Sequence, residues 1–412
     1  MSVDRRSRRT DDVGMIEPSD RSILQRHRHR YRLNDTCVAL FDAVLGIVER
    51  SPQPAIPRPR KILLANYGHL GDIVMSTACL SVLRKSFPDA AIGFLVGSWA
   101  RPVLEGHPDV HRLHVVDHWF MDRRPESRFV KAPRYWRACA AVAKELHVER
   151  YDVAIDLRAY MPNAIPVLRM AGIPIRIGYT KVGFGPLLTH PRKFVYRRKH
   201  ESAVQTDLLE VLGIPKLVRD KAEFSLPFSE VGFAQARLHM DGAGWSGKQY
   251  RVIHVGASVP VRDWPIESWR ALAKRLITDG HRLVFTGRGL RDQRLIGQIT
   301  HDLSNCLSTC DTLSWAGLVE MIRDAELVYS VETAAGHIAV AVGTPVVAIY
   351  GGMQDYRHWA PRPGPTSVCL SNIVPCWPCF TYNGCGDEKC LAGIAVDDVY
   401  MAGEGVISRC AN

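Results

Sequence analysis

Long apolar runs are absent from this 412-residue sequence. A helix that crosses a bilayer needs about 20 consecutive, mostly apolar residues, and no stretch approaches that length. The chain opens with Arg5, Arg6, Arg8 and Arg9, but no apolar core follows them as it does in a secretory signal peptide. We therefore expect a cytoplasmic protein.

The sequence also has neither a disulfide framework nor a recognised nucleic-acid-binding module. Its eleven cysteines should be reduced, because the cytosol keeps thiols reduced. The net charge of +11 favours an anionic partner. A lipid-linked or phosphorylated glycan at the inner face of the cytoplasmic membrane fits better than nucleic acid, although a basic cluster is often only a solvated face. Two basic groups stand out: Arg123, Arg124, Arg128, Lys131, Arg134 and Arg137, and Arg192, Lys193, Arg197, Arg198 and Lys199.

The apolar runs that are present alternate with helix-compatible stretches, and this alternation occurs twice. It predicts an α/β protein with two Rossmann-like domains, each with a parallel sheet covered on both faces. The expected strands are 62–65, 92–96, 113–116 and 153–157, then 252–255, 283–286, 327–331 and 346–350. The predicted segments are a basic extension and proline-rich linker (1–58), a first domain (59–215), an interdomain linker (216–248) and a second domain (249–412). Ligands are expected between the domains, beyond the carboxyl ends of the strands.

The first candidate site lies where a strand passes into a helix, at Asn66-Tyr-Gly-His-Leu-Gly-Asp72. Gly68, His69 and Gly71 form the turn, and the positive end of the helix dipole should keep Asp72 ionised. An ionised carboxylate in this position could accept a proton from an attacking hydroxyl. The alternative is that Asp72 only caps the helix.

The second candidate site is His254-Val-Gly-Ala-Ser258, followed by Arg262 in the loop before a helix. The small residues that end at Ser258 permit close approach of a phosphate. Arg262 could supply a fixed positive charge to a pyrophosphate leaving group, or it could be an ordinary surface arginine.

The third candidate site, Ser330-Val-Glu-Thr-Ala-Ala-Gly-His337, again joins a strand to a helix. Such a segment exposes several backbone N–H groups and is a general phosphate cradle. Its proposed ligand-binding residues are Glu332, Thr333, Ala334, Gly336 and His337. Repulsion from phosphate should direct Glu332 toward sugar hydroxyls, whereas His337 has the alternative of a satisfied core histidine.

In this order, the three sites resemble glycosyltransferase family 9, the heptosyltransferases that build the inner core of lipopolysaccharide. The similarity runs from about Lys61 to about Tyr400. Its most specific parts are Gly68-His-Leu-Gly-Asp72, Phe87-Pro-Asp-Ala, Glu105-Gly-His-Pro-Asp-Val, Tyr151-Asp-Val-Ala-Ile-Asp156, Arg262-Asp-Trp-Pro, and the run from Glu332 to Gly351.

The resemblance implies a GT-B fold and an inverting transfer that requires no cofactor for catalysis. The first domain would bind the acceptor and the second a nucleotide sugar, here ADP-heptose. Asp72 falls at the family's base position, and Arg262 falls where a basic residue meets the donor phosphates. The family's usual Asp-Thr-Gly is Glu332-Thr333-Ala334 in this chain, and the longer carboxylate can select another sugar without changing the reaction class.

A cysteine-rich loop at 369–390 contains Cys376, Cys379, Cys385 and Cys390 in a C-x2-C-x5-C-x4-C pattern. Four thiols at this density are typical of a tetrahedral thiolate site, so these residues are candidate ligands of a structural Zn or Fe ion. A loop of reduced, unligated thiols is the alternative. A protein-glycosylating branch of the family resembles this chain in these cysteines and uses them to bind iron.

Two other functions remain open from the sequence. One is a different GT-B activity, such as a sugar-nucleotide epimerase or a transferase with another nucleotide sugar or a protein or polymer acceptor. The other is a non-catalytic nucleotide-sugar binder. Sugar transfer to a lipopolysaccharide acceptor would exclude the epimerase, and an effect of Asp72→Asn on turnover would exclude the binder.

Overall fold

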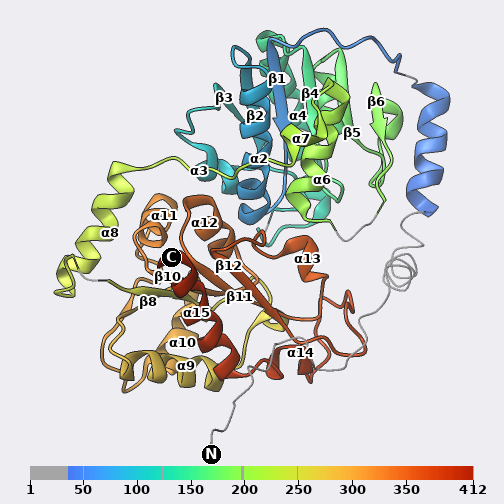
Figure 1. Cartoon of the computed structure of the whole chain (residues 1–412). Helices are drawn as coiled ribbons and strands as arrows, with labels where there is room; N and C mark the ends of the chain where they lie inside the picture. Colours follow the sequence, from blue (N-terminus) through green and yellow to red (C-terminus); the bar gives the residue numbers. More distant parts are fainter. Residues whose placement is uncertain (1–35, 50, 123, 196–198, 248, 412) are drawn as a thin grey trace, which may run out of the picture.

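The structure, a computed structural model, describes residues 36–49, 51–122, 124–195, 199–247 and 249–411. It contains two six-stranded parallel sheets, with strand orders β3-β2-β1-β4-β5-β6 and β9-β8-β7-β10-β11-β12. Numbered from its own first strand, each sheet has the order 3-2-1-4-5-6 of a doubly wound Rossmann fold. The two units lie one above the other (Figure 1). The predicted fold class is therefore confirmed.

The first sheet consists of β1 (Lys61–Ala65), β2 (Ala91–Val96), β3 (Arg112–Val115), β4 (Val153–Asp156), β5 (Ile175–Tyr179) and β6 (His190–Arg192). The second consists of β7 (Arg251–His254), β8 (Leu283–Thr286), β9 (Cys306–Ser308), β10 (Leu327–Val331), β11 (Val346–Tyr350) and β12 (Ser367–Ser371). All eight expected strands are present to within one residue at each end. The sequence interpretation missed β5, β6, β9 and β12.

Helices cover both sheets. They are α2 (Leu70–Ser86), α3 (Arg101–Leu104), α4 (Arg128–Glu149), α5 (Ile165–Met170), α6 (Glu201–Asp207), α7 (Lys216–Arg219), α8 (Glu230–Gly242), α9 (Ile266–Thr278), α10 (Gly289–Thr300), α11 (Trp315–Arg323), α12 (Ala334–Val342), α13 (Tyr356–Trp359), α14 (Lys389–Ala392) and α15 (Val396–Ala411). A further helix occupies residues 36–48, where the sequence shows a helical pattern. Residues 1–35 of the predicted extension lie outside the described residues, and the predicted division at 216–248 stays a prediction. Among the helices described, none has the length and apolar character that a bilayer crossing requires.

The strands form where the sequence is continuously apolar, because both faces of each central strand are covered. In β1, for example, Ile62, Leu63 and Leu64 are fully buried. One hydrophobic cluster extends through both units, from Ile73 of α2 to Ile338 of α12. Helices α2 and α12 pack against each other at the junction. The two helices that follow β1 and β10 therefore bring the carboxyl ends of these strands together.

Candidate active site

Asp72 is the third residue of α2, and His69 is the N-cap. Asp72 is therefore not the N-cap itself, but it takes part in capping the helix as its third residue. Its Oδ2 atom accepts a hydrogen bond from the His69 backbone N–H at 2.8 Å, which satisfies one of the free donors at the helix start. The capping interaction fixes the carboxylate at the end of β1.

The turn before α2 requires glycine at position 68. A Cβ atom added to Gly68 would lie 2.4 Å from Asp72 Oδ2 and 2.6 Å from Arg158 Nη1. The Trp99 indole N–H donates to the Gly68 carbonyl at 2.9 Å and holds the turn from outside. The close approach of backbone and carboxylate explains the predicted importance of Gly68.

Arg158, which the sequence interpretation missed, forms an ion pair with Asp72. Its Nη1 lies 2.9 Å from Asp72 Oδ2, and both side chains are almost completely buried. Arg158 follows the carboxyl end of β4, beside β1 in the sheet. Its backbone N–H donates to Asp156 Oδ1 at 3.0 Å, and its guanidinium donates to the carbonyl of Met161 at 3.2 Å. Arg158 is thus held rigidly against Asp72.

The carboxylate of Asp72 is ionised and has one oxygen available. Burial raises the pKa of Asp72, but the charge of Arg158 and the hydrogen bonds from His69 outweigh burial and hold this pKa well below its usual range. The contacts with His69 and Arg158 all use Oδ2. Within the part of the chain that the structure describes, Oδ1 makes no hydrogen bond, and the side chain remains 11% exposed. Oδ1 is therefore available to accept a proton.

Arg158→Met should shift the acid limb of the activity profile. Activity through Asp72 requires the ionised form and is lost as pH falls through its pKa. Without the Arg158 charge this pKa rises, so we expect the acid limb of kcat/KM to move up by about one to three pH units. Activity measured from pH 3 to 8 tests this: the wild-type enzyme and Arg158→Lys should keep kcat/KM toward the acid end, because the pKa of Asp72 lies well below its usual range, whereas Arg158→Met should lose it. An acid limb that stays in place would show that Arg158 does not control Asp72.

On the second sheet, the predicted phosphate cradle lies at the start of α12. Thr333 is the N-cap, and its hydroxyl accepts from the Ala335 N–H at 3.3 Å. Gly336 is packed so closely that an added Cβ would lie 2.8 Å from Pro361 Cγ and 3.0 Å from Ser330 Oγ. The helix start thus presents backbone N–H groups and the positive end of a dipole, which favour an anion.

Arg262 lies next to this cradle and is not an ordinary surface arginine. It ends a short 3-10 turn, Pro260–Arg262, and its Nη2 lies 3.2 Å from Glu332 Oε1. Burial raises the pKa of Glu332, and the charge of Arg262 offsets part of that increase. Ser258, in contrast, is exposed in the loop after β7. The second and third candidate sites are therefore joined by the Arg262–Glu332 pair.

The first and third candidate sites meet across the junction of the domains. A Cβ atom added to Gly71 would lie 2.9 Å from His337 Cδ2 and 3.7 Å from Ala334 Cα. Burial lowers the pKa of His337 to about 4, against the opposite effect of the Asp72 charge. His337 is therefore neutral at pH 7, and Gly71 allows the two helix starts to approach this closely.

Three buried polar atoms around the cradle have no hydrogen-bond partner among the described residues: Ser330 Oγ, His337 Nδ1 and Arg262 Nε. Buried polar atoms are nearly always paired in folded proteins, because leaving one unpaired costs about 1–3 kcal/mol. Their grouping beside one helix start indicates that a polar ligand belongs there.

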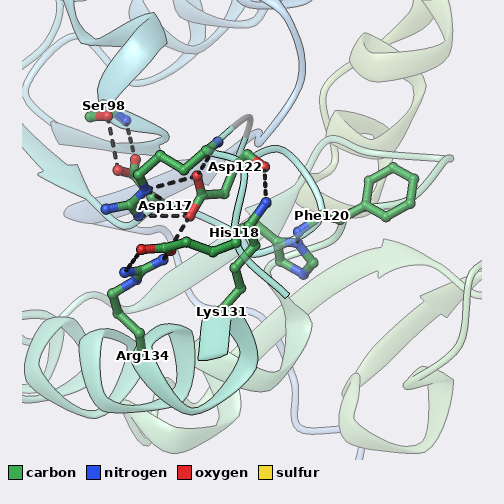
Figure 2. Close-up of polar contacts among 9 residues, drawn as sticks. Ser98, Asp117, His118, Phe120, Asp122, Lys131 and Arg134 are labelled. Carbon is green, nitrogen blue, oxygen red and sulfur yellow. Dashed lines mark hydrogen bonds and ion pairs between the residues drawn. The ribbon is translucent and has the colours of Figure 1, made fainter. Parts of the chain in front are cut away.

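The first basic group borders the acceptor side of the junction. Its loop packs on the residue before Gly68, with the rings of His118 and Tyr67 5.8 Å apart. Asp122 is the centre of a polar network with Arg124 and Arg134, and the Lys131 amine donates to the Asp122 carbonyl at 2.8 Å. Figure 2 shows Phe120 pointing away from this network. Acidic residues thus neutralise part of the predicted basic surface. Arg123, the first residue of this group, lies outside the described residues.

The second basic group is also partly neutralised. Arg192 pairs with Glu210 at 3.4 Å, and Lys199 pairs with Asp207. Arg197 and Arg198 lie outside the described residues. This group carries less free charge than its sequence indicates.

A metal site at the four loop cysteines stays a prediction. The pKa of Cys390 is raised, mainly by burial. The charges of Cys379 and Cys385 raise it further, so these two thiols lie near Cys390. However, the described residues contain no group of three or more His, Cys, Asp or Glu side chains placed to hold a metal ion. Cys369 is separate from these thiols: it lies on β12, where burial and the charge of Glu332 raise its pKa.

Comparisons with known proteins agree on one family. The sequence model of glycosyltransferase family 9 (heptosyltransferase) matches residues 139–388. Lipopolysaccharide heptosyltransferase 3 of Escherichia coli is 24% identical over 305 residues, which cover 71% of this chain and 83% of that protein.

Solved structures of the same family share the fold. A family 9 glycosyl transferase from Veillonella parvula DSM 2008 aligns with a TM-score of 0.70 at 20% identity, covering 85% of this chain and 97% of that one. The E. coli ADP-heptose lps heptosyltransferase II aligns with a TM-score of 0.66 at 20% identity, covering 85% and 100%. The predicted GT-B arrangement is therefore confirmed.

Proposed function

The chain belongs to glycosyltransferase family 9, the heptosyltransferases, and on that premise we propose that it transfers heptose from ADP-heptose to a hydroxyl of a lipopolysaccharide core or related glycan. The observation that carries this proposal is the meeting of two features at the domain junction. One is a carboxylate with an open oxygen, at Asp72, and the other is a phosphate cradle at the start of α12.

In the proposed reaction, an acceptor hydroxyl attacks the anomeric carbon of the donor sugar from the side of Asp72. A new C–O bond forms, and the bond between the anomeric carbon and the phosphate oxygen breaks with its electron pair going to ADP. The hydroxyl proton passes to Asp72 Oδ1. Attack opposite to the leaving group inverts the configuration at the anomeric carbon.

The low pKa of Asp72 is compatible with this role. An acceptor hydroxyl becomes strongly acidic only as its oxygen bonds to the anomeric carbon, so a weak base that is always ionised takes the proton late in the step. The charge that develops on ADP is stabilised by Arg262 and by the N–H groups at the start of α12. Neutral His337 contributes a hydrogen-bonding ring nitrogen without adding charge.

The acceptor is proposed to be lipid-linked and to reach the enzyme at the inner face of the cytoplasmic membrane. Lys131 and Arg137, beside the acceptor side of the junction, would attract its anionic groups. In the described part of the chain, neither residue has an acidic side chain as an ion-pair partner. The charges of Lys131 and Arg137 therefore remain available to the acceptor, whereas Arg124 and Arg134 are neutralised by acidic side chains.

A panel of nucleotide sugars tests the donor assignment. We expect ADP-heptose to raise the melting temperature selectively over ADP-glucose and UDP- or GDP-sugars, since binding at 100 times Kd adds about 2.7 kcal/mol to stability. Glu332→Asp, which restores the acid usual in the family, should change the ranking among sugars but not among nucleotides. Selective stabilisation by another sugar nucleotide would overturn the donor assignment, and no response to any would overturn the donor site.

We propose a structural role for the cysteine-rich loop, including any Zn or Fe that it binds. The loop packs against the second domain, where a Cβ added to Gly352 would lie 3.3 Å from Cys390 Sγ. Cys379→Ser should therefore lower the melting temperature and any metal content found by elemental analysis, with turnover preserved at temperatures where the variant is folded. Loss of turnover in the fully folded variant would contradict a structural role.

A further inference from the structure

A buried ion pair joins the two units of the molecule. Glu201 is the first residue of α6, which packs against α2 in the first unit. His358 lies in α13 of the second unit, where the Tyr350 hydroxyl of β11 donates to the carbonyl of Trp359. The Nε2 atom of His358 lies 3.0 Å from Oε2 of Glu201, and the two side chains are 1% and 0% exposed. Figure 1 shows α13 at the junction, below α6.

The neighbours of this pair place one proton between the two side chains. The Nδ1 atom of His358 lies 2.5 Å from the backbone carbonyl of Lys199, which can only accept a hydrogen bond, so Nδ1 carries a proton. Oε1 of Glu201 accepts from the Gln205 amide at 3.1 Å, and the Tyr160 hydroxyl lies 3.5 Å from His358 Nε2. Nε2 and Oε2 would repel each other if both were bare acceptors, so one of them carries a proton. The contact is therefore attractive.

The ion pair is one of three contacts that hold residues 358–362, which we call the clasp segment, against the first unit. The second contact is a hydrogen bond of 2.9 Å between Nε2 of His200 and the Ala360 carbonyl. Burial lowers the pKa of His200 to about 3, so its ring is neutral and donates through Nε2. In the third, Arg362 donates at 2.6 Å to the carbonyl of Ala222, in a segment that is hydrogen-bonded to α2. The clasp segment is thus held at every second residue.

Between two of these contacts, Pro361 packs on the start of α12. A Cβ atom added to Gly336, the third residue of α12, would lie 2.8 Å from Pro361 Cγ, so the proline ring lies directly against the helix. The backbone N–H groups at this helix start can bind a phosphate well only while they are held in position. Pro361 therefore connects the clasp segment to the phosphate cradle.

We propose that Glu201 and His358 are positioning residues for the donor, because their contact holds the clasp segment, and with it Pro361, against the start of α12. The inference rests on the proposed function in one respect, namely that the start of α12 binds the donor diphosphate. It deepens that function by making donor binding depend on a contact with the first unit, which otherwise serves the acceptor. The donor then binds tightly only while the two units are joined at the clasp segment.

Calorimetry with ADP, and hydrogen exchange without any ligand, test this proposal on the full-length protein. Glu201→Leu removes the contact with His358 without leaving a buried carboxylate. We expect ADP to bind about tenfold more weakly, which is within the usual range for coupling between two sites. The amide hydrogens of α12 should exchange about tenfold faster, whereas those of α9 should exchange as in the wild type. The KM for the donor should rise by the same factor with kcat nearly unchanged, because the contacts of Asp72 are kept.

Two further variants serve as references. In Glu201→Gln the new amide N–H can donate to His358 Nε2 while its carbonyl accepts from Gln205, so ADP affinity and exchange should stay within about twofold of the wild type. The matched control is Glu326→Leu, which removes a glutamate that pairs with Arg251 at 2.9 Å. This pair lies within the second unit, at the end of β10 remote from the cradle. The variant should lower the melting temperature without weakening ADP binding.

Pro361→Ala, which removes the ring from Gly336, replaces Glu201→Leu if thermal unfolding shows that Glu201→Leu is not folded, and the same effects are expected of it. Wild-type ADP affinity and α12 exchange in the folded variant would overturn the proposal. Equally faster exchange in α9 and α12 would also overturn it, because that result shows only a general loss of stability. Wild-type protein that does not bind ADP would overturn the proposed donor, and the exchange of α12 would then decide whether the clasp segment holds this helix.

Discussion

Asp72→Asn is expected to lower turnover by about 10²–10⁴ and to change donor affinity little, with some loss of melting temperature because buried Arg158 loses the charge that it pairs with. The amide has nearly the same size and still accepts the hydrogen bond from the His69 N–H, so the start of α2 is preserved. It cannot take the proton of the acceptor hydroxyl. Turnover is measured by ADP release at saturating donor and acceptor, donor affinity by calorimetry, and folding by thermal unfolding.

The matched control is Asp89→Asn, the same chemical change at an exposed residue beyond the other end of α2. It should leave turnover within about twofold, as expected for a surface substitution away from the site. If Asp72→Asn retained wild-type turnover, Asp72 would be only the helix-capping residue that the structure also shows.

Arg262→Ala has the second largest expected effect, a loss of about 10²–10³ in turnover together with weaker donor binding. Arg262 is the cation next to the α12 cradle. Negative charge on the leaving ADP increases as the bond between the anomeric carbon and the phosphate oxygen breaks, so loss of Arg262 should affect this step most. Glu332, which pairs with Arg262, would be left buried without its partner. The effect on turnover should therefore be accompanied by some loss of stability.

Two further variants separate these contributions. Arg262→Ala with Glu332→Gln removes the unpaired carboxylate, so it should recover stability but not turnover. Arg288→Ala, at an exposed arginine after β8, is the matched control for loss of a positive charge near the same sheet edge. Equal effects of Arg262→Ala and Arg288→Ala on turnover would remove Arg262 from the proposed mechanism.

The sequence pattern predicted the central strands well because these strands are buried on both faces. Runs such as 327–331 and 346–350 are almost entirely apolar, and the structure shows the same boundaries. The missed strands have weaker patterns. β6 and β9 have only three residues each, β6 contains Pro191, and β5 contains the buried but charged Arg176. Short strands near a sheet edge depend on pairing with neighbours that a local pattern does not reveal.

The candidate site was predicted residue by residue but not as an assembly. Asp72, Arg262 and Glu332 were each identified from local strand-to-helix segments. The contact between Gly71 and His337 joins positions far apart in the chain, and no local pattern indicates it. Arg158 was missed because a single arginine after a strand is not distinctive. The available signal was its place after β4, since β4 neighbours β1 in a sheet of order 3-2-1-4-5-6.

The most direct test of sugar transfer is mass spectrometry of a heptose-free lipopolysaccharide core acceptor after incubation with ADP-heptose and the purified enzyme. Our account predicts addition of heptose to the acceptor, one ADP released for each sugar added, an inverted configuration at the anomeric carbon, and almost no product with Asp72→Asn. An unmodified acceptor, or equal product from the wild-type enzyme and Asp72→Asn, would contradict it.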